Sequence, residues 1–526
     1  MERSLPPCYR LLHTSVLRND FRRLAIYILL LTYFCYTLYH ASRKPLSIVK
    51  TVLHRSGVNG QLRTVGFTSD GWKPFDSDNW SQLLGGLEYI YLFVYAVSMI
   101  LSGFLAERVN LRYFLSIGMF LSGVSTFAFG LASYFEIHYY SYFVFIQVFS
   151  GFVQASGWPA VVTLVGNWWG KSRRGLIMGL WNSHTSLGNI IGSVIAGIYV
   201  ETNWGASFYL PGLIMMVGAL VVYLTVIEHP NMVYNSASSE KTGTQIPISG
   251  SIYGLNRDSG SYCDIINVHL RGNIDRERSD KDGLRPLISD IEATRPINFI
   301  EALLLPSVFT YSLLLFFTKL VSYTFLYWLP NYLTIVEHVS AEQAAKLSVL
   351  FDVGGIIGGV LIGWFSDSQS NGQNLNEDEK TIKKRALACL VMLACAAPLL
   401  LAYRSMTSAN SLMSLILLTC CGSAINGPYA LVTTAVSADL GTQSALLGRT
   451  RALATITSII DGMGSLGAAL GPLLTGLLVP YGWSVVFAML ITSDLLAMLM
   501  SIWIVVNSSR RQNRRTYYRL QSTIPI

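Results

Sequence analysis

The feature that most constrains this chain is a series of apolar runs, each about 20 residues long, that recurs from end to end. A helix of that length crosses the roughly 30 Å hydrocarbon layer of a bilayer. Lipid offers backbone N–H and C=O groups no hydrogen-bond partners, so such runs are expected to be helices. Of the 526 residues, 52% are hydrophobic and 13% are charged, against about 25% charged in soluble domains. We therefore expect an all-α membrane protein.

Twelve apolar runs can be distinguished, and a polar stretch divides them into two groups of six. The expected spans are residues 22–42, 83–106, 111–133, 139–164, 175–199, 206–227, 302–329, 345–366, 386–404, 411–436, 452–478 and 483–506. The stretch between the groups is rich in Ser, Asn, Asp, Arg and Gly, which is typical of a disordered linker. The expected domains are an N-terminal six-helix half (1–228), a cytoplasmic linker (229–297), a C-terminal six-helix half (298–508) and a basic cytoplasmic tail (509–526).

The distribution of basic residues predicts how the chain lies in the membrane. The short loops after spans 2, 4, 8 and 10 carry Arg108, Arg112, Lys171, Arg173, Arg174, Lys380, Lys383, Lys384, Arg385, Arg449 and Arg451. The short loops on the opposite side carry Lys346 and Arg404. Since Lys and Arg concentrate in cytoplasmic loops, both termini are expected in the cytoplasm.

Several function classes are disfavoured. The net charge of +8 does not indicate nucleic-acid binding, because the basic residues cluster at span ends, where membrane topology explains them. The seven cysteines show neither metal-ligand spacing nor a disulfide framework. There is no Gly-x-x-x-x-Gly-Lys-Ser/Thr loop and no set of catalytic residues. We expect no cofactor, no metal and no enzymatic activity, and any transport must be secondary. The oligomeric state stays open.

A short motif recurs at the same position in each half and suggests internal duplication. Gly103 precedes Glu107 and Arg108 at the end of span 2, and Gly363 precedes Asp367 at the end of span 8. The glycine allows two helices to approach closely. The charged residues are predicted to form cytoplasmic gating pairs that break when the halves move. The alternative is ordinary charge at the membrane edge.

Ionisable residues inside the first span are the strongest candidates for a binding site. Charge within a span is costly and marks a functional site by default. Span 1 ends with Tyr36, His40, Arg43 and Lys44. The two cations lie at the expected non-cytoplasmic end, where positive charge is disfavoured, so an anion site is predicted. Arg offers a planar fork that matches phosphate oxygens, and Lys adds a point charge. The alternative is that both side chains reach to the interface.

Span 7, the counterpart of span 1, carries a third cation. Lys319 and Tyr323 lie four residues apart and so share one face of the helix. A cation from each half facing a shared cavity suits a dianion bound between the repeats. A structural ion pair is the alternative explanation for Lys319.

Further polar residues within spans have less certain roles. His184 in span 5 is a candidate phosphate donor, although a hydrogen bond between helices would also explain it. Among the acids, Asp352 in span 8 is the predicted partner of Lys44 or Lys319, in a bridge that competes with substrate. Asp461 is predicted to be structural.

Seven strings resemble the eukaryotic sugar-phosphate exchangers, the glucose-6-phosphate/phosphate antiporters in the organophosphate branch of the major facilitator superfamily. These strings occupy 42–50, 156–160, 166–171, 181–186, 319–330, 351–355 and 426–434. The bacterial glycerol-3-phosphate/phosphate antiporters are similar to a lesser degree. Their Arg-Lys pair matches Arg43-Lys44, and the likeness implies that Arg43 is a phosphate ligand. Their second phosphate arginine aligns with Ser322, so Lys319 would act from about one turn away.

The resemblance implies the twelve-helix fold of that superfamily and a secondary antiporter, which exchanges inorganic phosphate for an organic phosphate such as glucose 6-phosphate by alternating access. It also implies residence in the endoplasmic reticulum membrane. A carrier of another organic anion, a carrier of phosphate alone and a non-transporting sensor on the same fold are the alternatives. The sequon Asn79-Trp80-Ser81 is a candidate glycosylation site on the non-cytoplasmic side.

Overall fold

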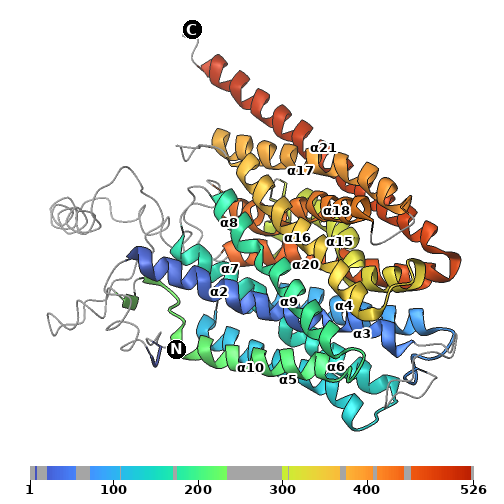
Figure 1. The fold of residues 1–526 in the computed structure, drawn as a ribbon. Helices are drawn as coiled ribbons and strands as arrows, with labels where there is room; N and C mark the ends of the chain where they lie inside the picture. The colour runs from blue at the N-terminus through green and yellow to red at the C-terminus, as the bar shows by residue number, and fades with distance from the viewer. Residues whose placement is uncertain are drawn as a thin grey trace.

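The computed structural model describes residues 6–8, 21–54, 71–106, 108–169, 174–230, 232–233, 299–305, 307–367, 375–406, 411–443 and 452–522. Across these ranges the regular secondary structure is helical, without a strand. The helices run roughly along one common axis, and the N-terminal half lies beside the C-terminal half (Figure 1). The start of α2 and the end of α21 lie at the same end of the bundle.

The helices of the N-terminal half follow the expected order. They are α2 (Phe21–Arg43), α3 (Pro45–Leu53), α4 (Trp80–Ala106), α5 (Leu111–Tyr134), α6 (Tyr140–Gln154), α7 (Gly157–Trp168), α8 (Arg174–Asn182), α9 (His184–Tyr199) and α10 (Ala206–Thr225). Within this half α2 packs against α9, α4 against α6, and α5 against α10.

The C-terminal half repeats this pattern. Its helices are α14 (Phe299–Leu303), α15 (Val308–Val336), α16 (Ala341–Ser366), α17 (Leu375–Arg404), α18 (Leu412–Leu431), α19 (Ser437–Leu440), α20 (Ala452–Leu478) and α21 (Trp483–Ser522). A π-helical turn (Val432–Val436) joins α18 to α19, and a 3-10 turn (Val479–Tyr481) precedes α21. Here α16 packs against α18, α15 against α20, and α17 against α21.

Eleven helical segments in the described ranges are long and apolar enough to cross a membrane. The sequence predicts twelve spans, and the remaining one, 175–199, corresponds to α8 and α9. Ser183 interrupts this span, so neither piece reaches spanning length alone. The all-α fold class is confirmed, although some bounds differ: span 7 is Val308–Val336 rather than 302–329, because a separate short helix, α14, precedes it. The linker predicted at 229–297 lies outside the described residues except for 229, 230, 232 and 233.

Prolines explain two irregularities in these helices, because a proline has no N–H for the carbonyl four residues earlier. Pro159 leaves the carbonyl of Ala155 without its helical partner at the break between α6 and α7. Ser102 Oγ donates to that oxygen at 2.7 Å. Pro330 does the same to Leu326 in α15, and Lys44 Nζ donates to that oxygen at 2.8 Å. Side chains from neighbouring helices therefore supply the hydrogen bonds that the helices lack.

Close glycine contacts join the two halves at both ends of the bundle. A Cβ on Gly476 of α20 would lie 2.5 Å from the carbonyl oxygen of Ser81 in α4, and one on Gly462 would lie 3.0 Å from Ile100. A Cβ on Gly179 of α8 would lie 2.6 Å from the carbonyl oxygen of Gly359 in α16. At the other end of that seam, a Cβ on Gly197 would lie 3.1 Å from Ala345 Cβ. Both seams are therefore packed along their length.

The outer surface of the bundle is apolar. Leu101, Phe145, Val217 and Trp364 each expose more than 60% of their surface. A soluble protein rarely exposes so many large apolar side chains together, whereas lipid tails are a suitable solvent for them. The bilayer is thus the partner that this surface requires.

Candidate functional site

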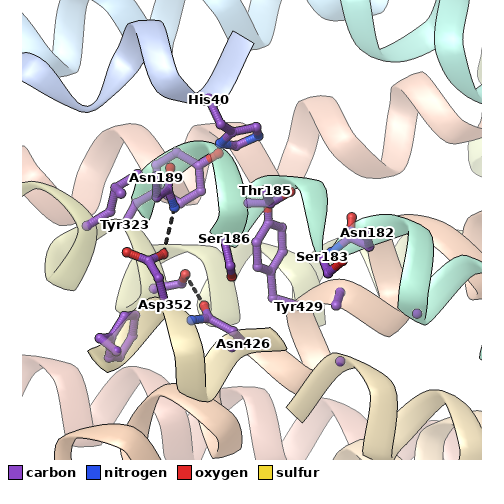
Figure 2. Close-up of a pocket in the computed structure, with 17 residues that line it drawn as sticks. His40, Asn182, Ser183, Thr185, Ser186, Asn189, Tyr323, Asp352, Asn426 and Tyr429 are labelled. Carbon is purple, nitrogen blue, oxygen red and sulfur yellow. Dashed lines mark hydrogen bonds between the residues drawn. The ribbon is translucent and has the colours of Figure 1, made fainter. Parts of the chain in front are cut away.

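Polar side chains from both halves meet around a cavity at the centre of the bundle, here called the central cavity. Its empty volume is about 460 Å³, and its walls come from α2, α8, α9, α15, α16 and α18. Figure 2 labels its main lining residues: His40, Asn182, Ser183, Thr185, Ser186, Asn189, Tyr323, Asp352, Asn426 and Tyr429. Few proteins bury so many hydrogen-bonding groups in a membrane domain without a polar ligand or an ion pathway.

A hydrogen bond across the central cavity joins the two halves. Asn189 Nδ2 on α9 donates to Asp352 Oδ1 on α16 at 2.8 Å, and Figure 2 shows the two side chains pointing toward each other. The predicted ion pair between Asp352 and Lys319 is not formed, whereas Lys44 interacts with the charge of Asp352 from beyond ion-pair distance. Neither lysine forms an ion pair with Asp352 within 4 Å in the described structure, because Lys44 reaches across to α15 and Lys319 faces α20.

A second hydrogen bond shapes the C-terminal wall of the central cavity. Ser322 Oγ donates to Asn426 Oδ1 at 2.5 Å, which joins α15 to α18. Next to it, Gly355 leaves no room for a side chain, since a Cβ there would lie 2.8 Å from Ser186 Oγ. The α16 backbone therefore approaches α9 directly at this level.

A second cavity, here called the lateral cavity, lies mainly within the N-terminal half. Its empty volume is about 410 Å³. The wall residues are Ser42, Arg43, Leu46, Glu88, Tyr91, Ser125, Thr126, Phe129, Ile146, Gln147, Ser150, Gln154, Phe208 and Tyr327. The last turn of α2 contributes to both cavities, His40 to the central one and Arg43 to the lateral one.

Arg43 is a buried guanidinium that has no carboxylate partner within the part of the chain that the structure describes. Its exposed fraction is 6%, its Nε donates to Gln154 Oε1 at 2.7 Å, and its Cζ lies 4.7 Å from the centre of the Tyr95 ring. One terminal nitrogen, Nη2, has no hydrogen-bond partner among the described residues. Burying a cation this way is unfavourable unless an anion joins it. The geometry thus leaves Arg43 able to bind an anion.

Lys44, the neighbouring cation, is bound to the opposite half. It is fully buried, and its Nζ donates to the carbonyl of Leu326, the group that Pro330 leaves free. Its side chain packs against Gly192 of α9, where a Cβ would lie 2.8 Å from Lys44 Cβ. A carbonyl oxygen does not neutralise the ammonium charge, so Lys44 adds to the positive potential beside Arg43.

Lys319 has a carboxylate partner. Its Nζ lies 2.6 Å from Asp461 Oδ1 on α20 and donates to Ser465 Oγ at 3.4 Å. The rings of Tyr323 and Tyr429 lie 5.9 and 5.4 Å from the ammonium. Lys319 lines neither cavity in this conformation, so an anion would have to displace or share it with Asp461.

Three of the remaining predicted residues form an aromatic cluster beside Arg43. The Tyr36 ring lies 4.9 Å from His184 and 5.5 Å from His40, and its hydroxyl is 3.4 Å from that of Tyr95. His184 is fully buried, contacts Thr185 Oγ1 at 3.2 Å and lines neither cavity. Of the three, His40 lines the central cavity and its Nδ1 has no partner among the described residues.

Two buried polar residues escaped the sequence-based prediction. Lys50 Nζ lies 2.6 Å from Glu88 Oε1, donates to the carbonyl of Tyr327 at 3.2 Å and sits 3.8 Å above the Trp328 ring. Gln154 accepts from both Arg43 and the Tyr91 hydroxyl, each at 2.7 Å. The sequence did offer an indication for Lys50, because Glu88 within span 2 required a cation as its partner. It offered none for Gln154, a single glutamine in an apolar helix.

The predicted gating charges at the cytoplasmic loops differ in what surrounds them. Asp367 lies 3.4 Å from Arg385, which also lies 3.2 Å from Asp439, so α16, α17 and α19 meet there. In the N-terminal half Arg108 donates to the carbonyl of Phe104 at 2.7 Å. Glu107 lies outside the described residues.

The candidate glycosylation residue Asn79 is exposed and directly precedes α4. Ser77 Oγ donates to Asn79 Oδ1 at 2.6 Å. The third residue of the sequon, Ser81, is 2% exposed inside the helix. An enzyme would thus reach Asn79 more easily than the rest of its sequon.

The comparisons with known proteins identify the family. The sequence pattern of the Major Facilitator Superfamily matches residues 32–456. The chain belongs to this superfamily. It is 48% identical over 481 residues to the human protein named glucose-6-phosphate exchanger SLC37A2, with 90% of each chain covered. The mouse SLC37A2 protein is 46% identical over 488 residues, again with 90% of each covered. The human glucose-6-phosphate exchanger SLC37A1 is 43% identical over 515 residues, covering 91% of this chain and 92% of the relative.

This degree of identity over nearly the whole chain places it within the sugar-phosphate exchanger family of the superfamily, which is a family of transporters rather than enzymes. Among solved structures, a bacterial homolog of the human lysosomal transporter Spinster, in an inward-facing and unoccupied conformation, has a TM-score of 0.51. It is 14% identical and covers 93% of this chain and 96% of that one. That likeness concerns the fold alone.

Proposed function

We propose that this protein is a secondary antiporter that exchanges inorganic phosphate for an organic phosphate, glucose 6-phosphate, across its membrane by alternating access. The observation that carries the proposal is Arg43, a buried guanidinium with neutral partners and a free nitrogen at the wall of a polar cavity. The near full-length relatives named glucose-6-phosphate exchangers supply the substrate class.

Phosphate suits this site for reasons of charge and shape. The fork of Arg43 offers parallel N–H groups to two phosphate oxygens, and Lys44 and Lys319 contribute further positive charge. When the dianion binds, it neutralises cations that are otherwise buried at a cost. An empty carrier keeps that cost while its halves move, so the charge arrangement favours exchange over one-way transport.

Alternating access requires that the two seams between the halves open in turn. The contacts at Gly476–Ser81 and Gly197–Ala345 would separate in one state, and those at Gly179–Gly359 in the other. The Asn189–Asp352 hydrogen bond lies between these ends and joins the halves at the level of the central cavity. We place the midpoint of the rocking motion near this hydrogen bond.

We further propose that both termini face the cytoplasm and that the protein resides in the endoplasmic reticulum membrane. The first rests on the basic loops after spans 2, 4, 8 and 10. The second rests on the family. On this orientation Asn79 faces the non-cytoplasmic side, and removal of an N-glycan by glycosidase, followed as a mobility shift, tests whether it is modified.

The test is transport by the purified protein in liposomes loaded with phosphate. Uptake of labelled glucose 6-phosphate should require internal phosphate, and the Arg43→Ala variant should lose about 10- to 100-fold of the rate, as expected for a charge-assisted hydrogen bond. Arg43→Lys keeps the charge but removes the fork, so it should retain an intermediate rate.

The outcomes separate the alternatives. Phosphate/phosphate exchange without glucose 6-phosphate uptake would indicate a carrier of phosphate or of another organic anion, which a panel of labelled anions identifies. Loss of both activities in well-folded wild-type protein would favour a non-transporting sensor. Normal exchange by Arg43→Ala would remove Arg43 from the site.

A further inference from the structure

The lateral cavity differs in chemistry from a site for phosphate alone. Only one of its wall residues, Arg43, is a cation, and most of the others are amides, hydroxyls or aromatic rings. On α6, Gln147, Ser150 and Gln154 follow at spacings of three and four residues and form a polar strip on one helix face. Phe129 and Phe208 contribute apolar surface to the same cavity.

We infer that the lateral cavity binds the polyhydroxylated part of the organic phosphate, with Gln147 as a residue that determines specificity for a hexose. The inference rests on the proposed function and deepens it: Arg43 holds the phosphate at one end, and the sugar extends along the α6 strip toward Gln147. Amides and hydroxyls both donate and accept, as sugar hydroxyls do, and the apolar rings suit the C–H faces of a pyranose.

The length of the strip fits a hexose phosphate. Gln154, which contacts Arg43 directly, and Gln147 are seven residues apart on α6. At 1.5 Å per residue they are separated by about 10 Å along the helix axis. A three-carbon phosphate bound at Arg43 would end before it reached Gln147, whereas a six-carbon sugar would reach it. The volume of about 410 Å³ lies in the range of small-molecule sites.

The hydrogen-bonding groups of this cavity have capacity left for a ligand. Gln147 lines the cavity wall, and Glu88 Oε2 has no hydrogen-bond partner among the described residues, although Oε1 lies beside Lys50. Ser125 and Thr126 donate to the carbonyl of Ser122, which leaves the lone pairs of both hydroxyls as acceptors. A carboxylate oxygen and several hydroxyl acceptors are what a ligand with many O–H donors requires.

Phosphate alone would leave most of these groups to water, and water satisfies them nearly as well. The cavity therefore accommodates both exchange partners. Inorganic phosphate occupies the Arg43 end with water along the strip, and the sugar of the organic phosphate displaces that water. Selectivity between sugar phosphates then depends on Gln147 and Ser150, whereas affinity for phosphate depends on Arg43 and on Gln154, which contacts it.

The experiment measures inhibition of labelled phosphate/phosphate exchange in proteoliposomes by unlabelled glucose 6-phosphate, glycerol 3-phosphate and phosphate. Gln147→Leu should raise the half-inhibitory concentration of glucose 6-phosphate roughly 3- to 10-fold, the range for one lost hydrogen bond. The values for phosphate and glycerol 3-phosphate should stay unchanged. Ser150→Ala is a second variant with a smaller shift in the same direction. Ser193→Ala, a buried polar residue on α9 that lines neither cavity, is the control.

The result can overturn the inference in two ways. Equal shifts in the half-inhibitory concentrations of all three anions in Gln147→Leu would show that the residue is a structural support. No shift for any of them would show that the sugar does not bind at Gln147. If wild-type exchange of labelled phosphate is intact but glucose 6-phosphate does not inhibit it, the sugar assignment of the proposed function itself fails. Intact phosphate/phosphate exchange in each variant shows that the protein is folded.

Discussion

At the scale of single residues, five of the buried cations in the described part of the chain fall into two groups. Lys50, Lys319 and Arg385 each lie within 4 Å of a carboxylate. Arg43 and Lys44 instead contact an amide and a backbone carbonyl. A cation paired with a carboxylate is structural, or it binds a ligand only after the pair separates. A cation whose hydrogen-bond partners are neutral keeps its charge available for an anionic ligand. This difference singles out Arg43 and Lys44 more clearly than their positions in the sequence do.

Gln154 is the residue that positions Arg43. One of its oxygens accepts from both Arg43 Nε and the Tyr91 hydroxyl, and its amide nitrogen lies 3.4 Å from Ser150 Oγ. Because the guanidinium fork must be oriented to bind two oxygens, loss of this acceptor should weaken phosphate binding without removing the charge.

We predict that Gln154→Leu raises the half-saturating phosphate concentration about tenfold, which corresponds to one charge-assisted hydrogen bond, and that Gln154→Glu does not restore it. A glutamate would form an ion pair with Arg43 and compete with the anion. Phosphate titrations of exchange in proteoliposomes measure both variants. A purely structural role for Gln154 would instead lower the maximal rate of both and leave the half-saturating concentration unchanged.

At the scale of elements, α3 is held in place by one buried ion pair. Lys50 on α3 pairs with Glu88 on α4, and the same ammonium reaches the carbonyl of Tyr327 and the ring of Trp328 on α15. Lys44 makes a parallel contact with Leu326 one residue earlier on α15. The segment after α2 is thus attached to the opposite half by two lysines.

We predict that Lys50→Met lowers the free energy of unfolding by about 3–5 kcal/mol, because it leaves Glu88 buried and uncompensated. The double variant Lys50→Met/Glu88→Gln, which removes both charges, should recover most of that loss. Thermal unfolding in detergent, followed by tryptophan fluorescence, measures the two variants and the single Glu88→Gln change. Additive effects in this cycle would mean that the two residues do not interact energetically.

At the scale of the whole molecule, both seams between the halves are closed around the two cavities. Exchange requires one end to open while the other stays shut. At the seam between α9 and α16, a Cβ on Gly197 would lie 3.1 Å from that of Ala345, so a small separation of the two helices would bring the pair into the disulfide range of about 3.5–4.5 Å. This position therefore offers a covalent test of the motion.

We predict that oxidation of the double variant Gly197→Cys/Ala345→Cys stops exchange almost completely and that reduction restores it. Each single variant and the wild type, treated with the same oxidant, control for the native cysteines, of which Cys395 and Cys420 are exposed. Undiminished exchange in the cross-linked protein, with the disulfide verified by mass spectrometry, would rule out separation of the halves at this seam.

Much of this architecture follows from the sequence alone. The apolar runs determined the helices, because lipid leaves the backbone no other way to satisfy its hydrogen bonds, and the polar stretch between runs six and seven indicated two halves. Because charge within a span is costly, the sequence also identified Arg43, Lys44 and Lys319 as residues with a functional or structural role.

Only the tertiary structure decided which groups these residues meet. Asp461 rather than Asp352 partners Lys319, because the face of α15 that carries Lys319 packs on α20. The carbonyl of Leu326, which accepts from Lys44, is free because of Pro330 in the C-terminal half. Gln154, which contacts Arg43, is 111 residues away in the sequence. The periodicity and hydropathy of a segment indicate which helix faces contact lipid and which are buried. The pairing of buried charges depends instead on how the helices are rotated against one another, which no local sequence pattern encodes.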